Sequence, residues 1–293
     1  MTIVNEVEDM PMGQPETGRV IVRHGLATRI THWTWAVALF FLLLSGLQIF
    51  NAHPSLYIGN QSGFEFDNAI LEIGAVRGDD GQPRGVTTVF GRSFTTTGVL
   101  GMSGVAENPS YRGFPAWATL PSYQDLSTGR VIHFFFAWFF VAAFLVWLVS
   151  SLINGHIRRD ILPSLADVRA LPQSLADHLR LRFHHDGRYN GLQKFAYAGV
   201  LLVVFPLIIL TGLTMSPGMN AAWPWLLDVF GGRQTARTLH FLCMALLVLF
   251  FIVHIFMVFA AGPLNEMRSI VTGRYRTDAP LKENETLEQE TRR

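Results

Sequence analysis

The chain has 293 residues, of which 49% are hydrophobic and 15% are charged, and its formal net charge is +1. This composition excludes an ordinary soluble domain, and the near balance of charge gives no reason to expect nucleic acid as a partner. The single cysteine excludes an iron–sulfur cluster, a c-type haem attachment and an internal disulfide.

Four apolar runs contain no Asp, Glu, Lys or Arg and are long enough to cross about 30 Å of hydrocarbon as helices. They cover about residues 30–50, 131–157, 195–215 and 238–261. The first run does not resemble a cleaved signal peptide, because about thirty residues precede it and no small-residue cleavage site follows it. The expected fold class is an all-α integral membrane protein with a four-transmembrane-helix bundle in residues 19–275. The polar ends, residues 1–18 and 276–293, are expected to be disordered tails.

The basic residues indicate how the helices are oriented. Residues 19–29, residues 158–194 and the C-terminal tail hold sixteen of the twenty-three Lys and Arg residues. Because basic residues favour the cytoplasmic side, both termini and the second loop are expected in the cytoplasm. The loops at about 51–129 and 216–236 then face the periplasm. The expected location is the bacterial inner membrane.

Four histidines lie within the apolar runs, at His32, His133, His240 and His254. His240 and His254 are fourteen residues apart, so they lie on nearly the same side of one helix, about 21 Å apart along it. If helices alternate in direction, His133 and His240 lie at matching depth near the outer face, and His32 can pair with His254 nearer the inner face. The inner match is imperfect, so the first helix is expected to tilt or to begin earlier.

Two facing histidines are suitable axial ligands for a haem iron, so the pattern predicts two b-type haems. A single intramembrane histidine is as often a hydrogen-bonded packing residue, but four in two pairs favour ligation. Zinc or copper would more often recruit Cys, Asp or Glu as well.

Three arginines and one glycine support this interpretation. Arg29, Arg130 and Arg237 each precede a candidate ligand by three residues and are candidates for binding haem propionates. Basic residues also flank membrane helices routinely. Gly46 lies fourteen residues after His32, at the level of the outer haem, where a missing side chain leaves room for the macrocycle.

The four-helix plan, the R-I-T-H-W sequence at Arg29–Trp33 and the histidine spacing of the fourth run resemble the di-haem cytochrome b561 superfamily over about residues 20–275. The chain is most similar to the cytochrome b subunits of bacterial formate dehydrogenase, nickel-iron hydrogenase and thiosulfate reductase. This resemblance implies that His32 and His254 bind one haem and that His133 and His240 bind the other, as the topology suggests.

The resemblance also implies a quinone or quinol site near the cytoplasmic haem, at the start of the third helix. Asn190 and Gln193 lie there in an arrangement similar to the family's Asn-x-x-Gln-Lys pattern, with His24 or the basic second loop assisting proton exchange. A polar helix cap at the water boundary is an equally simple explanation for these two residues.

The first outer loop, residues 51–129, is expected to fold as a periplasmic cap. Residues 64–77 and 85–97 are strand-like and surround a Gly-Asp-Asp-Gly turn signal. A loop of this size suggests a docking platform for a periplasmic redox partner, with a lid over the haem edge as the simpler alternative. The segment Leu120–Trp138 resembles the thiosulfate-reductase-type subgroup, which implies a molybdopterin oxidoreductase as that partner.

The expected function is therefore electron transfer across the membrane between the quinone pool and a periplasmic redox enzyme, without catalytic residues of the chain's own beyond the quinone site. One alternative is a stand-alone cytochrome b561-type oxidoreductase that acts on superoxide or ferric ion, and another is a haem-free anchor or transporter. The order of the two haem potentials depends on burial and on hydrogen bonds to the ligands, which the sequence leaves open.

Overall fold

The computed structural model describes residues 20–78, 80–105, 108–179 and 191–276. The expected tails, apart from Arg276, and the candidate quinone residue Asn190 lie outside these ranges. Four helical stretches within them are long and apolar enough to cross a membrane. They are α1 (Leu26–Phe50), α2 (Leu126–Ile153), a composite third helix over Gly191–Met215, and α8 (Arg233–Ala260).

The helix boundaries differ from the predicted ones in a consistent way. α1, α2 and α8 each begin about one turn earlier than the apolar runs, because Arg29, Arg130 and Arg237 lie inside the first turns of the helices. A long arginine side chain can extend to the membrane boundary from such a position. α2 ends at Ile153 instead of residue 157, because the chain reverses through Gly155 at a φ of 66°.

The third helix consists of α4 (Gly191–Ala198), the π-helical segment η3 (Gly199–Val204) and α5 (Phe205–Met215). Pro206 lies in the first turn of α5 and has no N–H to continue the α-helical hydrogen bonding. The wider π-helical turn in front of it leaves room for the proline ring and keeps the helix continuous.

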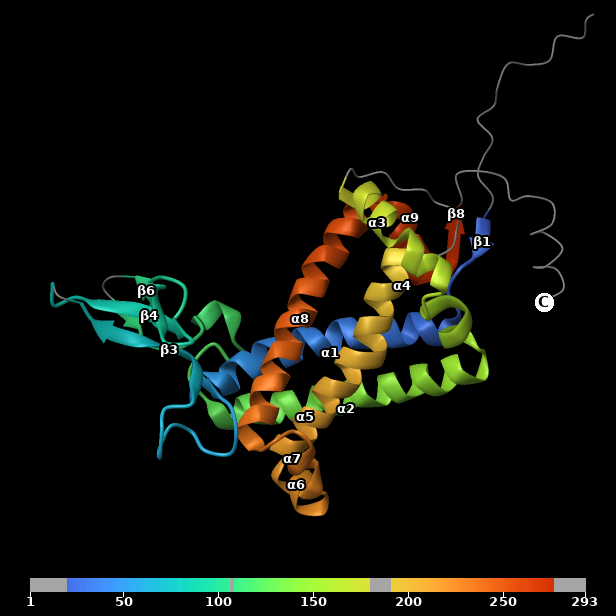
Figure 1. Cartoon of the computed structure of the whole chain (residues 1–293). Coiled ribbons are helices and arrows are strands. Elements are labelled where there is room, and N and C mark those ends of the chain that lie inside the picture. The colour runs from blue at the N-terminus through green and yellow to red at the C-terminus, as the bar shows by residue number, and fades with distance from the viewer. Residues whose placement is uncertain (1–19, 79, 106–107, 180–190, 277–293) are drawn as a thin grey trace, which may run out of the picture.

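Aromatic side chains form the core where α1, α2 and the third helix meet. Trp35 packs edge to face against Trp147 and Phe205, at ring-centroid distances of 5.9 and 5.2 Å. Phe140 and Phe144 belong to the same buried cluster. Figure 1 shows α1 and α2 lying along each other and α8 crossing α1, with the third helix beside α8.

The segment between α1 and α2, residues 51–125, is a folded unit that we call the cap. It contains an antiparallel sheet in the order β2-β3-β4-β5, formed by Ser55–Tyr57, Ala69–Arg77, Pro83–Val89 and Arg92–Thr95. A smaller sheet pairs β6 (Ser103–Val105) with β7 (Asn108–Ser110), and the 3-10 helix η1 (Ala116–Ala118) follows. The predicted strand-turn-strand pattern is present, with two differences: residues 64–68 form a loop and not the start of β3, and a turn at residues 90–91 divides the stretch 85–97 into β4 and β5.

Arg112 joins the cap to the spanning helices. Its side chain is 8% exposed and donates to the carbonyls of Phe114 and Ser122, each at 2.7 Å, and to the Thr119 hydroxyl. It also contacts Gln48 Oε1 of α1 at 3.4 Å. Arg112 is therefore one of the groups that attach the cap to this end of α1, which is the outer end in the predicted orientation; Gln48 is another, because its Nε2 donates to the Tyr123 carbonyl at 2.8 Å.

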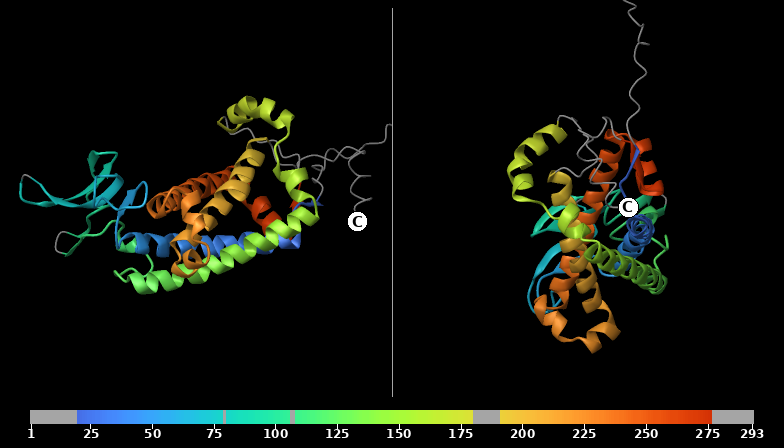
Figure 2. Two further views of the ribbon diagram at one scale, coloured as in Figure 1. Left: turned by 60° about the horizontal axis from the view of Figure 1, so that its bottom comes forward. Right: turned by 90° about the vertical axis from the view of Figure 1, so that its right-hand side faces the viewer.

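The opposite end of the molecule holds both ends of the described chain. β1 (Val20–Val22) pairs antiparallel with β8 (Arg274–Arg276), and α9 (Pro263–Thr272) precedes β8 (Figure 1). Figure 2 shows this strand pair and the cap at opposite ends of the bundle. On the side of this end, α3 (Leu165–Leu179) is joined to α4 by an ion pair of 3.0 Å between Asp167 and Lys194. The short segments η2 (Ile157–Ile161), α6 (Pro217–Ala222) and α7 (Trp225–Val229) complete the described helices.

Replacing Arg112 with methionine is expected to loosen the cap. The change leaves the carbonyls of Phe114 and Ser122 without their donor and costs about 2–3 kcal/mol. Amide hydrogen exchange in residues 108–123 then accelerates by roughly one to two orders of magnitude. The matched control is Arg84→Gln, which removes an ion pair with Asp80 whose two side chains are 49% and 48% exposed, and which is worth at most about 1 kcal/mol. Equal exchange in the two variants would contradict the anchoring role of Arg112.

Candidate haem-binding site

The four intramembrane histidines form two facing pairs. The ring centroids of His133 on α2 and His240 on α8 are 6.3 Å apart, and those of His32 on α1 and His254 on α8 are 6.4 Å apart. Two metal–nitrogen bonds of about 2 Å each, with half an imidazole ring behind each nitrogen, span roughly 6 Å. Each pair therefore has the separation that one iron between two imidazoles requires.

The two members of each pair lie at the same distance from a helix end. His133 is the eighth residue of α2 and His240 is the eighth of α8. His32 is the seventh residue of α1, and His254 is the seventh from the end of α8. The early start of α1 thus removes the mismatch in depth that the sequence indicated for the inner pair.

Hydrogen bonds orient the His133 ring at the outer pair. Its Nδ1 lies 3.1 Å from the Ser45 hydroxyl. That hydroxyl donates to the Phe41 carbonyl at 2.6 Å, so it accepts from the His133 ring. Nδ1 therefore carries the hydrogen, and Nε2 keeps a lone pair.

The His240 ring is held by the same arrangement from a different helix. Its Nδ1 lies 3.0 Å from the Ile208 carbonyl and 3.1 Å from the Thr211 hydroxyl. The Thr211 hydroxyl donates to the Leu207 carbonyl at 2.7 Å. Both outer imidazoles therefore direct Nε2 to the space between them, in the tautomer that a metal ligand requires.

Glycines adjoin the same two rings. A Cβ atom on Gly46 would lie 3.3 Å from Cε1 of His133, and one on Gly212 would lie 3.2 Å from Cε1 of His240. Both contacts are tighter than side chains normally tolerate. Gly46 therefore leaves room for the His133 ring, and Gly212 does the same for the His240 ring. The predicted role of Gly46 toward the macrocycle stays a prediction.

The inner pair is less hydrogen-bonded. Nδ1 of His32 is buried without a hydrogen-bond partner among the described residues. His254 stacks on Phe250 at a centroid distance of 5.7 Å, and His32 meets Trp33 edge to face at 5.4 Å. Contacts with aromatic rings therefore orient the inner pair, whereas hydrogen bonds orient the outer pair.

The arginines lie one turn from their histidines but are partly engaged with protein groups. Arg29 donates to the Val271 carbonyl, and Arg237 donates to the His53 carbonyl and lies over the Phe50 ring. Arg130 lies over the ring of Phe134 at 5.8 Å. Binding of haem propionates by these three residues stays a prediction.

Of the two candidate quinone residues, the structure describes Gln193, at the end of the bundle that the predicted orientation makes the inner one. Gln193 is in the first turn of α4, next to the Lys194 that pairs with Asp167. His24 lies just before α1, where burial, followed by the charge of Arg23, lowers its pKa to about 4. This imidazole is therefore neutral at pH 7.

The donor set favours haem over other metals. Among the described residues, no three His, Cys, Asp or Glu side chains are gathered to hold a metal ion. Cys243 is a buried free cysteine. Two imidazoles are too few for a typical zinc site, whereas a porphyrin supplies the remaining ligands of a bis-histidine haem. The residues present therefore fit a haem at each pair.

A family model described as prokaryotic cytochrome b561 matches residues 23–273. The chain belongs to the prokaryotic cytochrome b561 family. Membership makes it a multi-pass membrane electron-transfer protein with b-type haem. The cytochrome is also 25% identical, over 232 residues, to YedZ1 of Azospira oryzae, which is described as a putative protein-methionine-sulfoxide reductase subunit. The similarity covers 78% of this chain and 86% of the relative.

The sequence reasoning missed Ser45 and Thr211 as parts of the outer site. A signal for them was present, because Leu-Ser-Gly-Leu at 44–47 and Leu-Thr-Gly-Leu at 210–213 repeat the same pattern. In each copy the hydroxyl and the glycine adjoin one outer imidazole of the cytochrome.

The paired substitutions Ser45→Ala and Thr211→Val are expected to raise the midpoint potential of the outer haem. Hydrogen bonds accepted from Nδ1–H make the ligand more basic and favour ferric iron, so their loss favours the reduced state. We expect about a threefold change in the ratio of reduced to oxidised haem, or roughly 30 mV for one electron.

Redox titration of the purified cytochrome with optical detection measures this shift. Thr214→Val is the matched control, because the Thr214 hydroxyl is buried on the same helix and donates to the Thr211 carbonyl. A titration curve identical to that of the wild type in the paired variant would show that the hydroxyls do not act on the haem.

Proposed function

We propose that this cytochrome carries electrons across the bacterial inner membrane between the quinone pool and a periplasmic redox enzyme, through two b haems in series. His32 and His254 would hold the inner haem, and His133 and His240 the outer one. The observation that supports this most strongly is that α8 presents two histidines about four turns apart, each facing a histidine of another helix at matching depth.

The chemistry of such a relay needs little from the protein beyond positioning. A haem b with two histidine ligands supplies one-electron transfer without an open position for oxygen. The chain fixes the tautomers of His133 and His240, leaves space at Gly46 and Gly212, and surrounds both pairs with apolar side chains. These functions are consistent with a carrier that has no catalytic residue in the membrane.

Quinol oxidation or quinone reduction is proposed at the inner end, near the start of the third helix. Gln193 would form a hydrogen bond with a quinone oxygen, and Asn190 is the second candidate from the sequence. Each quinol that is oxidised releases two electrons and two protons. Because the proposed site lies at the inner end, the protons would leave toward the cytoplasm. His24, which is neutral at pH 7, would assist this proton exchange.

The cap is proposed as the docking platform for the partner. It lies at the outer end of α1 and α8, where Arg237 reaches the His53 carbonyl and Thr238 donates to the Tyr57 carbonyl at 2.7 Å. The similarity to a putative reductase subunit favours a catalytic partner subunit over direct reaction with superoxide or ferric ion. We propose that this partner is a molybdopterin oxidoreductase that receives electrons from the outer haem. Electrons would then flow outward, from quinol through the two haems to the partner.

The quinone part is tested with the purified cytochrome in proteoliposomes, by following haem reduction on addition of a short-chain quinol. Gln193→Leu is expected to slow quinol-driven reduction about tenfold, because it removes one hydrogen bond of about 1.4 kcal/mol. Reduction by dithionite should stay unchanged, because dithionite does not need the site. Gln173→Leu on α3 is the matched control, since it alters an exposed glutamine on the same side of the membrane.

The outcomes separate the parts of the proposal. Quinol-driven haem reduction at the wild-type rate in Gln193→Leu would show that Gln193 is not part of the quinone site. A wild-type cytochrome that dithionite reduces but no quinol reduces would overturn the link to the quinone pool. Rapid oxidation by superoxide or ferric ion without any partner would favour the stand-alone oxidoreductase.

A further inference from the structure

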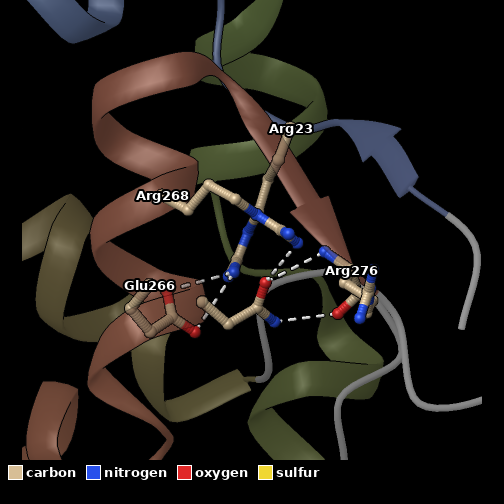
Figure 3. Close-up of polar contacts among 5 residues, drawn as sticks. Arg23, Glu266, Arg268 and Arg276 are labelled. Atoms are coloured by element: carbon tan, nitrogen blue, oxygen red, sulfur yellow. Dashed lines mark hydrogen bonds and ion pairs between the residues drawn. The ribbon is translucent and has the colours of Figure 1, made fainter.

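The two ends of the described chain form a clasp at the inner end of the bundle, which we define as residues 20–29 together with α9 and β8. β1 and β8 pair over Val20–Val22 and Arg274–Arg276. The Asn265 side chain donates to the Arg276 carbonyl and accepts from the Arg276 backbone N–H and from Arg268 (Figure 3). Asn265 therefore connects Arg268 to the backbone of Arg276 within the clasp.

The clasp carries a large excess of positive charge. It contains five arginines and one glutamate, namely Arg23, Arg29, Arg268, Arg274, Arg276 and Glu266. Glu266 forms an ion pair with Arg23 at 3.3 Å, between side chains that are 23% and 12% exposed (Figure 3). Arg23 also lies over the ring of the buried Tyr275. The one carboxylate of the clasp is thus engaged by Arg23, and no acid of the clasp balances the other arginines.

Three of these arginines surround one pocket. Arg29, Arg268 and Arg274 line it together with Val20, Val271 and Thr272. Nε of Arg29 and Nε of Arg268 are buried without a hydrogen-bond partner among the described residues. Guanidinium groups bind phosphate oxygens in a planar, often two-pronged arrangement, so the three arginines that line this pocket suit a phosphate.

An apolar surface adjoins the pocket. Leu264, Met267 and Val271 follow one face of α9 at helical spacing and are 88%, 44% and 49% exposed. Leu26 and Ile30, in the first turns of α1, are also exposed. A helix with an exposed apolar face beside basic side chains is typical of the membrane interface, with the apolar face in contact with acyl chains.

We propose that the clasp is a binding site for an anionic phospholipid. The phosphate lies among Arg29, Arg268 and Arg274, and the acyl chains lie along the apolar face of α9. The net charge of the pocket selects an anionic headgroup over a zwitterionic one, and the apolar face selects a lipid over free phosphate. The lipid would brace the pairing of β1 with β8 next to the His32 end of α1.

The test uses the full-length, haem-loaded protein after delipidation in detergent. Thermal unfolding is measured as dioleoylphosphatidylglycerol, dioleoylphosphatidylcholine or inorganic phosphate is added. We expect only the phosphatidylglycerol to raise the unfolding temperature. In Arg268→Gln/Arg274→Gln, half-maximal stabilisation should need about 25-fold more of this lipid, because each arginine near an anionic surface contributes about fivefold. Arg274→Gln alone keeps the Arg268–Asn265 bond and should shift the requirement about fivefold.

Arg158→Gln is the matched control, since it removes an exposed arginine outside the clasp, beyond the inner end of α2. It should respond to the lipid as the wild type does. An equal response in the double variant, or stabilisation of the wild type by inorganic phosphate alone or by phosphatidylcholine, would overturn the proposal. Loss of haem absorbance in the double variant without added lipid would assign these arginines to a haem propionate instead.

Discussion

A metal ion held by two imidazoles requires both rings to stand at a fixed separation, each with one bare nitrogen directed at the other. In the membrane this requirement is demanding, because no water is present to satisfy the second nitrogen of each ring. At the outer pair, Ser45 and Thr211 supply hydroxyls, and Ile208 supplies a backbone carbonyl. The positions of α1 and of the third helix against the ligand-bearing helices follow from this constraint.

Two similar four-residue segments meet this constraint at the outer pair. α1 supports the His133 ring of α2 with Leu-Ser-Gly-Leu, and α5 supports the His240 ring of α8 with Leu-Thr-Gly-Leu. At the inner level the support is different, because His254 stacks on Phe250 and His32 lacks a bond to its Nδ1 within the described residues. This difference in hydrogen bonding favours a lower potential for a haem held by the outer pair than for one held by the inner pair; burial and charge also contribute to both potentials.

Much of this arrangement could be predicted from the sequence, because apolar length and the fourteen-residue spacing of His240 and His254 do not depend on tertiary detail. The family match confirms the membership that these features indicated. The helix starts were misplaced, since a charge-free run underestimates a helix whose first turn carries an arginine. The engagement of Arg29 and Arg237 with the carbonyls of Val271 and His53 could not be foreseen, because it depends on which carbonyls the tertiary fold leaves exposed.

In the cap, too, one part of the structure could be predicted from the sequence and another part could not. Alternating residues around a glycine turn indicated the β3–β4 hairpin, but a buried arginine that joins the cap to α1 has no local signature. Arg112 forms its bonds with Phe114, Thr119, Ser122 and Gln48, and only the last of these lies outside the cap. The position of the cap over the outer pair therefore depends on contacts between segments that the sequence does not relate.

The most direct test of the account is the haem content per chain of the purified wild type, of His240→Ala and of His32→Ala, determined together with their reduced-minus-oxidised spectra. The account predicts about two b haems in the wild type and about one in each variant, with a different haem lost in each. Wild-type protein without haem, or a His240→Ala variant that retains both, would contradict it.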